Sequence, residues 1–129
     1  MSTDSNQASV LMSKNTPEKT LFTRIIDREL PADIIYEDSQ CVCIRDINPQ
    51  APTHVLLIPR KPIPTLADAT DEDKALLGHL MLRVGDIARW LGVDDGFRLV
   101  INNGKKGGQV VFHLHLHLLA NKTFSDDSL

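Results

Sequence analysis

The chain has 129 residues, of which 42% are hydrophobic and 24% are charged, and its formal net charge is −3. This size and composition are typical of one globular domain, and the negative charge argues against a mainly electrostatic surface for nucleic acid or membranes. No apolar run approaches the roughly 20 residues that cross a bilayer, and one Cys-x-Cys pair provides no disulfide framework, so we expect a cytoplasmic protein.

The first part of the chain predicts a tail and a short helix. Residues 1–19 are polar, lack periodicity and are expected to form a disordered tail. A short helix follows, for which Thr20 is a suitable N-cap. Pro31 is expected to stop it, because the residue before a proline avoids helical dihedral angles. The apolar stripe of this helix consists of Leu21, Phe22, Ile25 and Ile26.

Three strands are predicted next. Residues 34–37 and 41–45 are short β-type runs separated by Asp-Ser-Gln, which favours a hairpin. Residues 48–52 contain two prolines and predict a loop. Residues 54–59 carry four consecutive apolar side chains, Val-Leu-Leu-Ile, and predict a buried strand that begins at His54.

The remainder of the chain predicts a long helix and two more strands. The helix begins at Thr70, where acidic residues follow at its positive end, and it ends at Gly92. His79 lies off its apolar stripe and is expected at the surface. Residues 97–102 and 110–119 have strand patterns. Five strands with one short and one long helix predict an α+β fold, a two-layer domain with a five-stranded antiparallel sheet.

His113, His115 and His117 alternate with leucines. Because successive side chains of a strand point to opposite faces, this spacing predicts three imidazoles on one face and leucines on a buried face. A histidine side chain titrates near neutrality, so it can serve as a base, an acid, a nucleophile or a metal ligand.

Three explanations of this row are open from the residues alone. The histidines are incidental polar residues on a solvent face, or they bind a transition metal, or one of them is a nucleophile oriented by its neighbours. A metal site is disfavoured because histidines on a straight strand diverge, and Cys41 and Cys43 lie far upstream. We favour nucleophilic catalysis by His115, the middle histidine, with no metal and no other cofactor.

A glycine-rich segment precedes the histidines. Residues 102–109 read Asn-Asn-Gly-Lys-Lys-Gly-Gly-Gln. Glycines allow backbone N–H groups to approach an anion closely, and the lysines add positive potential. An ordinary hairpin turn explains the Asn-Gly pair equally well. Beside three histidines, however, the segment points to phosphoryl or nucleotidyl chemistry.

Four sequence blocks together resemble a known family. The segment from His113 to Leu119 resembles the histidine-triad motif, His-φ-His-φ-His-φ-φ, in which φ is apolar. The other blocks are residues 44–54 (Ile-Arg-Asp-Ile-Asn-Pro-Gln-Ala-Pro-Thr-His), residues 76–81 (Leu-Leu-Gly-His-Leu-Met), and Asn102 with Gly107-Gly108-Gln109. They resemble the Hint branch of the histidine-triad (HIT) family, the histidine-triad nucleotide-binding proteins. The resemblance implies a HIT domain over about residues 20–119, which typically forms a homodimer with a continuous ten-stranded sheet.

The resemblance also implies a function. Hint proteins hydrolyse purine nucleoside 5′-phosphoramidates and related AMP conjugates, so a purine nucleotide is the expected partner, with no nucleic acid and no membrane. His115 is expected to attack the α-phosphorus and form a covalent nucleotidyl-histidine, which water then hydrolyses. His113 and His117 are expected to orient His115 and to donate hydrogen bonds to phosphate oxygens, and His54 to support them from the third strand.

A nucleotide-binding set follows from the same resemblance. Asp46 is expected to bind the ribose hydroxyls, and Ile47 is expected to flank the base together with Phe22 and Ile25. In the glycine-rich segment, the backbone N–H of Gly108 is expected to face the phosphate. Two further residues of that segment belong to the expected set, Asn102 and Gln109.

The chain departs from the family pattern in two places. Val110 stands where Hint proteins usually carry a serine that helps protonate the leaving group. After Leu119 the family usually continues with Gly-Gly-Arg and ends in Trp-Pro-Pro-Gly, whereas residues 120–129 form a short divergent tail here. Two alternatives therefore stay open: a nucleotide-binding or regulatory module with weak activity, and a dinucleoside polyphosphate hydrolase or nucleotidyltransferase of the same family.

Overall fold

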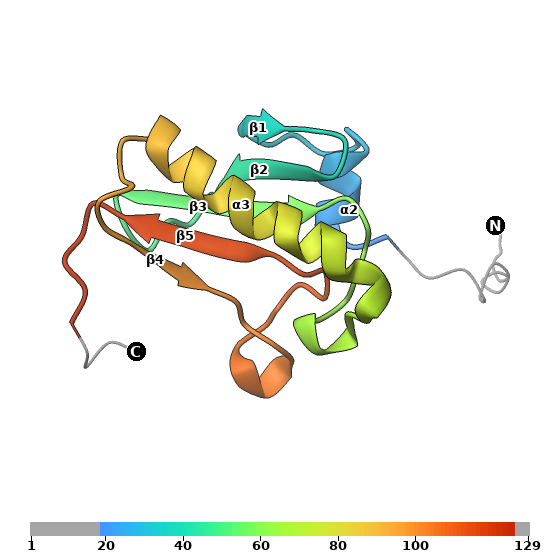
Figure 1. The fold of residues 1–129 in the computed structure, drawn as a ribbon. Helices are drawn as coiled ribbons and strands as arrows, with labels where there is room; N and C mark the ends of the chain where they lie inside the picture. The colour runs from blue at the N-terminus through green and yellow to red at the C-terminus, as the bar shows by residue number, and fades with distance from the viewer. Residues whose placement is uncertain (1–18, 126–129) are drawn as a thin grey trace, which may run out of the picture.

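The computed structural model describes residues 19–125, and its centre is a five-stranded antiparallel sheet in the order β1-β2-β3-β5-β4 (Figure 1). A long helix, α3, crosses one face of the sheet, and a short helix, α2, packs against the other face. The predicted α+β fold with its antiparallel sheet is confirmed. The tail predicted over residues 1–19 lies almost wholly outside the described residues. The elements are α2 Leu21–Ile26, β1 Ile34–Glu37, β2 Cys41–Arg45, β3 Thr53–Pro59, α3 Lys74–Trp90, β4 Phe97–Val100 and β5 Leu116–Ala120, with single 3₁₀ turns at Leu66–Asp68, Asp71–Asp73 and Lys105–Gly107.

The first two strands have their predicted bounds, but the last two are shorter than predicted. β4 ends at Val100, two residues early. β5 begins only at Leu116, which corrects the prediction of one strand over residues 110–119. Before Leu116 the chain bonds elsewhere, because the N–H of Leu114 donates to the carbonyl of Ile63, 2.7 Å away, in the connection that follows β3.

The short helix α2 begins as predicted and ends earlier than predicted. The hydroxyl oxygen of Thr20 accepts a hydrogen bond from the N–H of Thr23 at 3.0 Å, which is the expected N-cap. The helix ends at Ile26, and Arg28 takes a left-handed conformation with φ of 64°. Pro31 therefore follows the end of the helix without causing it.

The long helix α3 also begins close to the predicted position. Thr70 and Asp73 form a capping box around a 3₁₀ turn that leads into the helix at Lys74. At the other end, Gly92 has φ of 73°, a conformation that glycine adopts without strain. None of the helices in residues 19–125 combines the length and apolarity that a membrane crossing needs.

The alternation of side chains along β2 separates two hydrophobic cores. Cys41 and Cys43 face α3, while Val42 and Ile44 face α2, as the sequence pattern predicted. The leucines of the histidine segment are buried on the α3 side, which confirms the predicted leucine face. Consequently, side chains that alternate with these leucines point to the α2 side.

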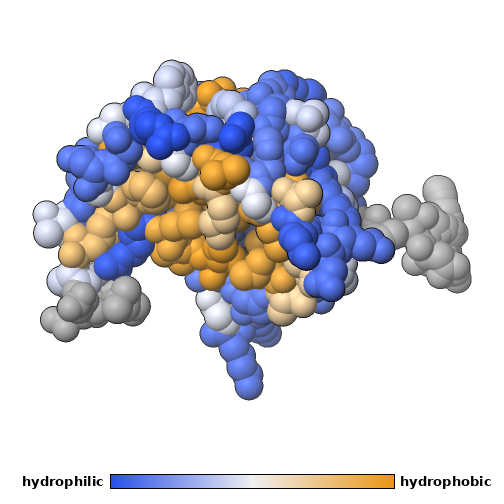
Figure 2. All heavy atoms as spheres, viewed as in Figure 1, coloured by the Kyte–Doolittle hydropathy of each residue, from blue (hydrophilic) through white to orange (hydrophobic). Residues whose placement is uncertain are grey.

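Apolar surface remains on the face that carries α3. In the view of Figure 1, hydrophobic side chains gather across the middle of this face (Figure 2). The exposed large apolar side chains include Met81 and Leu82 of α3 and Phe97 of β4. Because β4 is one of the two edge strands of the sheet, exposed apolar residues here adjoin an edge that is open to association.

Candidate active site

The candidate site lies on the α2 side of the sheet, where β3 and β5 are neighbours. In the register of these strands His117 is opposite Leu56, which belongs to the core under α2. The ring of His115 lies 4.9 Å from that of His117 and 4.8 Å from that of Phe22, measured between centroids. The sheet and α2 thus bring His115, His117 and Phe22 together.

The hydrogen bonding of His115 determines which of its nitrogens is reactive. Its Nδ1 lies 2.7 Å from the carbonyl oxygen of His113. A carbonyl only accepts hydrogen bonds, so Nδ1 must carry the proton and donate it. In the neutral ring Nε2 is then left with a free lone pair, which is the form that a nucleophile requires.

A backbone amide fixes the protonation of the next two histidines. The N–H of Gln50 donates to Nδ1 of His54 at 3.0 Å, so the neutral His54 carries its proton on Nε2. That Nε2 lies 3.0 Å from Nδ1 of His117 and donates to it. The proton of His117 is therefore on Nε2. This chain of hydrogen bonds leaves the Nε2–H of His117 as a donor, in a ring that lies 4.9 Å from the ring of His115.

Burial keeps these rings neutral. Removal from water lowers the pKa of His54 and the pKa of His115. It also lowers the pKa of His117, and repulsion from charge on His115 and His54 adds to this shift, which brings the pKa to about 4. The carboxylate of Asp46, whose Oδ2 lies 3.4 Å from Nε2 of His54, opposes the shift in each of these three pKa values. At neutral pH the site therefore holds uncharged imidazoles beside one carboxylate.

His113 has a different position from the other two histidines of the row. Its side chain is 0% exposed, its Nε2 donates to the carbonyl of Pro59 at 2.7 Å, and its Nδ1 faces the hydroxyls of Thr20 and Thr23 at 2.9 and 3.2 Å. Neither ring nitrogen is free, so the expectation that His113 donates to phosphate oxygens does not fit this geometry. Its contribution to the site is the carbonyl that orients His115.

Four of the residues expected to bind a nucleotide line one cavity of about 380 Å³ beside α2. Phe22 and Ile25 are buried in its wall, Asp46 has a side chain that is 19% exposed, and Ile47 is 98% exposed. The Asp46 carboxylate is held by the N–H of Asn48, which donates to Oδ1 at 2.8 Å. The other lining residues are Leu21, Leu30, Pro31, Ala32, Ile44, Arg45 and Leu56.

In the glycine-rich segment, the polar groups expected to bind a nucleotide form hydrogen bonds within the protein. The N–H of Gly108 donates to the carbonyl of Lys105 at 3.0 Å, so the expected presentation of this N–H to a phosphate does not fit the structure. Asn102 donates through Nδ2 to the carbonyl of Gly107 at 2.9 Å. Gln109 is buried and bonds the N–H of Gly104 and two carbonyls. The backbone amide of Gly108 and the side chains of Asn102 and Gln109 therefore stabilise the conformation of the loop.

One cluster at the site has the donors of a metal centre. The nearest donor atoms of Asp46, His54 and His117 all lie within 4.8 Å of one another. However, a metal needs the lone pair of His54 Nε2, and the amide of Gln50 keeps the proton there. Metal binding would break that bond, so the geometry favours a chain of hydrogen bonds over a metal ion.

Sequence reasoning missed three groups that position the site. Thr20 and Thr23 hold the ring of His113, and the amide of Gln50 sets the tautomer of His54. Thr20 was recognised only as a helix cap, although a Thr-x-x-Thr pair at the start of a helix also places two hydroxyls on one side. Every residue except proline has a backbone N–H, so no signal in the sequence indicated that the amide of Gln50 would bond His54.

Fold and site together define a histidine-triad protein: an antiparallel sheet in which His113 and His115 precede the fifth strand and His117 lies within it, with the Nε2 lone pair of His115 left free. The model of the HIT domain matches residues 27–124, and the chain belongs to this family.

Similar proteins support this assignment. The chain is 60% identical over 108 residues to a HIT-like protein of Synechocystis sp. that is described as uncharacterized, a match that covers 84% of this chain and 95% of that protein. Among solved structures, it resembles a HIT family hydrolase from Legionella pneumophila with a TM-score of 0.82 and 42% identity, covering 84% of this chain and 97% of that one. A HIT family hydrolase from Clostridium thermocellum matches with a TM-score of 0.83 and 40% identity, covering 88% and 100%.

Proposed function

We propose that this chain is a nucleotide hydrolase of the Hint branch, which cleaves purine nucleoside 5′-phosphoramidates or related AMP conjugates through a covalent nucleotidyl-His115. The observation that carries the proposal is the bond from His115 Nδ1 to the carbonyl of His113, which leaves Nε2 unprotonated in a buried, neutral ring. The description of two solved relatives as HIT family hydrolases supports a hydrolytic reaction.

The proposed reaction has two displacements at phosphorus. The lone pair of His115 Nε2 attacks the α-phosphorus, a nitrogen–phosphorus bond forms, and the bond to the leaving amine breaks as that amine takes up a proton. Water then attacks the same phosphorus and gives up a proton to solvent, the nitrogen–phosphorus bond breaks, and AMP leaves with His115 restored. The Nε2–H of His117 is a donor for the phosphoryl oxygens, where charge increases in each transition state.

The cavity beside α2 is the proposed nucleoside pocket. Its volume of about 380 Å³ lies within the range of small-molecule sites, roughly 300–1,000 Å³. Phe22, Ile25 and Ile44 provide apolar walls for a purine. The carboxylate of Asp46 is an acceptor for both hydroxyls of a ribose. Val110 is 88% exposed and offers no hydroxyl, so in this proposal the leaving group takes its proton from solvent.

Rapid-quench intact mass spectrometry with an adenosine phosphoramidate tests the proposal. The expected result is an acid-labile gain of one adenylate that is absent in His115→Ala, with turnover that a chelator does not change. Competition between the phosphoramidate and a dinucleoside polyphosphate identifies the preferred leaving group. If neither turnover nor adduct occurs while AMP still binds, the protein is a nucleotide-binding module and the hydrolase proposal is wrong.

We further propose that two copies associate through the face of α3 and β4. The edge position of β4 allows the two sheets to join, and the exposed side chains of Met81, Leu82 and Phe97 supply apolar contact area. Sedimentation of the protein and of Leu82→Glu tests this association. A monomeric wild-type protein would contradict it.

A further inference from the structure

A second cluster of side chains with donor atoms suited to a metal lies on the α3 side of the sheet, away from the candidate active site. Asp38 is in the turn between β1 and β2, Cys41 is the first residue of β2, and His79 is in α3. Their nearest donor atoms all lie within 4.8 Å of one another. Nε2 of His79 is 2.7 Å from Oδ2 of Asp38, and Sγ of Cys41 is 3.4 Å from Oδ1.

We propose that Asp38, Cys41 and His79 form a binding site for one zinc ion, with the fourth coordination position open to water. The donor set of a thiolate, an imidazole and a carboxylate is one that Zn²⁺ accepts in tetrahedral sites. The side chains of Asp38 and His79 are 22% and 23% exposed, so an ion can reach them, while Cys41 closes the inner side.

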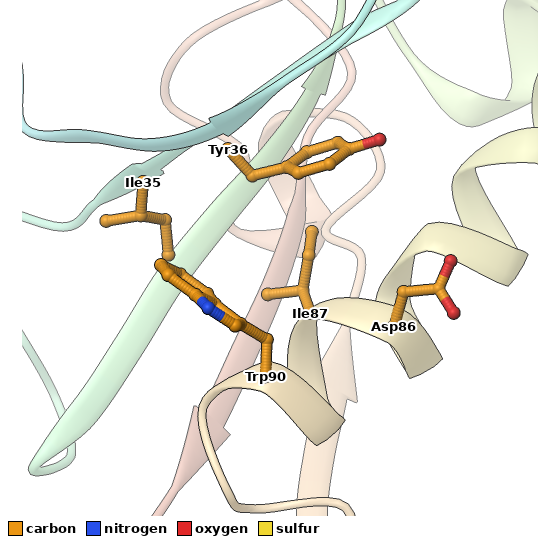
Figure 3. Close-up of a pocket in the computed structure, with 5 residues that line it drawn as sticks. All are labelled: Ile35, Tyr36, Asp86, Ile87 and Trp90. Atoms are coloured by element: carbon orange, nitrogen blue, oxygen red, sulfur yellow. The ribbon is translucent and has the colours of Figure 1, made fainter.

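The surroundings of Asp38 are those of a ligating carboxylate. Its Oδ2 accepts a hydrogen bond from the hydroxyl of Tyr36 at 2.7 Å, and its Oδ1 accepts from the N–H groups of Gln40 and Cys41 at 2.8 and 2.9 Å. Such bonds hold a carboxylate in a fixed orientation toward a metal. The ring of Tyr36 lines a cavity of about 380 Å³ between β1 and α3, and its hydroxyl points away from Trp90 (Figure 3).

His79 can provide a free Nε2 lone pair to a metal, whereas His54 cannot, because the amide of Gln50 keeps the proton of His54 on Nε2. No backbone amide in the described residues donates to Nδ1 of His79, so its proton can move from Nε2 to Nδ1 and free the Nε2 lone pair. The thiol proton of Cys41 must leave to solvent when the sulfur–zinc bond forms.

The charges of the filled site balance. The carboxylate of Asp38 and the thiolate of Cys41 together neutralise Zn²⁺. The guanidinium of Arg83, which faces Tyr36 and Cys41, is the adverse charge. It is offset by Asp86, whose Oδ2 lies 3.1 Å from Nε of Arg83.

Titration of the reduced, metal-free full chain with Co²⁺ tests the site. We expect one equivalent to produce a thiolate-to-cobalt charge-transfer band in the near ultraviolet together with the visible bands of four-coordinate cobalt, and Zn²⁺ to abolish both. Cys41→Ser should remove the charge-transfer band. Cys43→Ser is the matched control, because Cys43 is equally buried on the same face of β2 and should leave the band intact.

Two further variants keep the test decisive if Cys41→Ser does not fold. His79→Gln, at a partly exposed position, should weaken Zn²⁺ binding by about tenfold or more, the scale at which even outer-shell changes act. His54→Gln should not alter the cobalt spectrum, because the group around His54 contains no sulfur. Absence of a thiolate band in the wild-type protein, or a band that persists in Cys41→Ser or disappears in Cys43→Ser, would overturn the proposal.

Discussion

Replacement of His54 by phenylalanine tests the chain of hydrogen bonds that runs from the amide of Gln50 to His117. The variant keeps an aromatic ring in a position that is 6% exposed but removes the Nε2–H that now donates to His117 Nδ1. A buried acceptor left without its donor costs about 1–3 kcal/mol. Because 1.36 kcal/mol is a factor of ten, the Nε2–H tautomer of His117 should lose about fivefold or more of its advantage.

Long-range ¹H–¹⁵N NMR spectra of the histidine rings measure this directly. In the wild-type protein at pH 7 we expect His117 as the Nε2–H tautomer, and in His54→Phe a mixture with the Nδ1–H form and a fall in kcat of about fivefold or more. His54→Gln is the control, because its side-chain amide can accept from the N–H of Gln50 and donate to His117. This variant should restore most of the Nε2–H tautomer of His117 and most of kcat. An unchanged tautomer of His117 in His54→Phe would refute the assignment of this chain of hydrogen bonds.

Three more outcomes are expected. The pKa of His117 is lowered in the fold from 6.5 to about 4, so the unfolded chain takes up the proton first as the pH falls. The free energy of unfolding measured in urea should therefore be constant above pH 6.5 and should fall as the pH drops toward 4. This fall should be less steep in His117→Asn. Thr20→Ala removes both a helix cap and a partner of a buried histidine, and its unfolding free energy should fall by about 1 kcal/mol more than that of Thr65→Ala, a cap without such a partner. In calorimetry Asp46→Asn should weaken AMP binding by about tenfold or more, whereas Asp86→Asn, which alters an exposed ion pair on α3, should leave it unchanged.

The directions of side chains were predictable from the sequence because they follow from local periodicity. Alternation placed Leu114, Leu116 and Leu118 in the core, and the same rule separated Cys41 from Val42. The partners of the histidines were not predictable in this way. Thr20, which bonds His113, is 93 positions away, and no local pattern specifies such a pairing.

The glycine-rich segment shows a second limit of sequence reasoning. Gly104 and Gly108 have positive φ, as their use in a tight turn suggested. A flexible loop can direct its N–H groups outward to an anion or inward to its own carbonyls, and residue types do not distinguish the two. The 3₁₀ turn at Lys105–Gly107 directs the N–H of Gly108 inward.

The burial of His113 has a consequence for observation of the protein in solution. An imidazole N–H exposed to water exchanges its hydrogen rapidly, but the Nε2–H of His113 is enclosed and bonded to the carbonyl of Pro59. Its hydrogen can exchange with solvent only when the contact between the end of β3 and the histidine segment opens. The rate at which this one proton is replaced by deuterium would therefore measure how often the support beneath His115 comes apart.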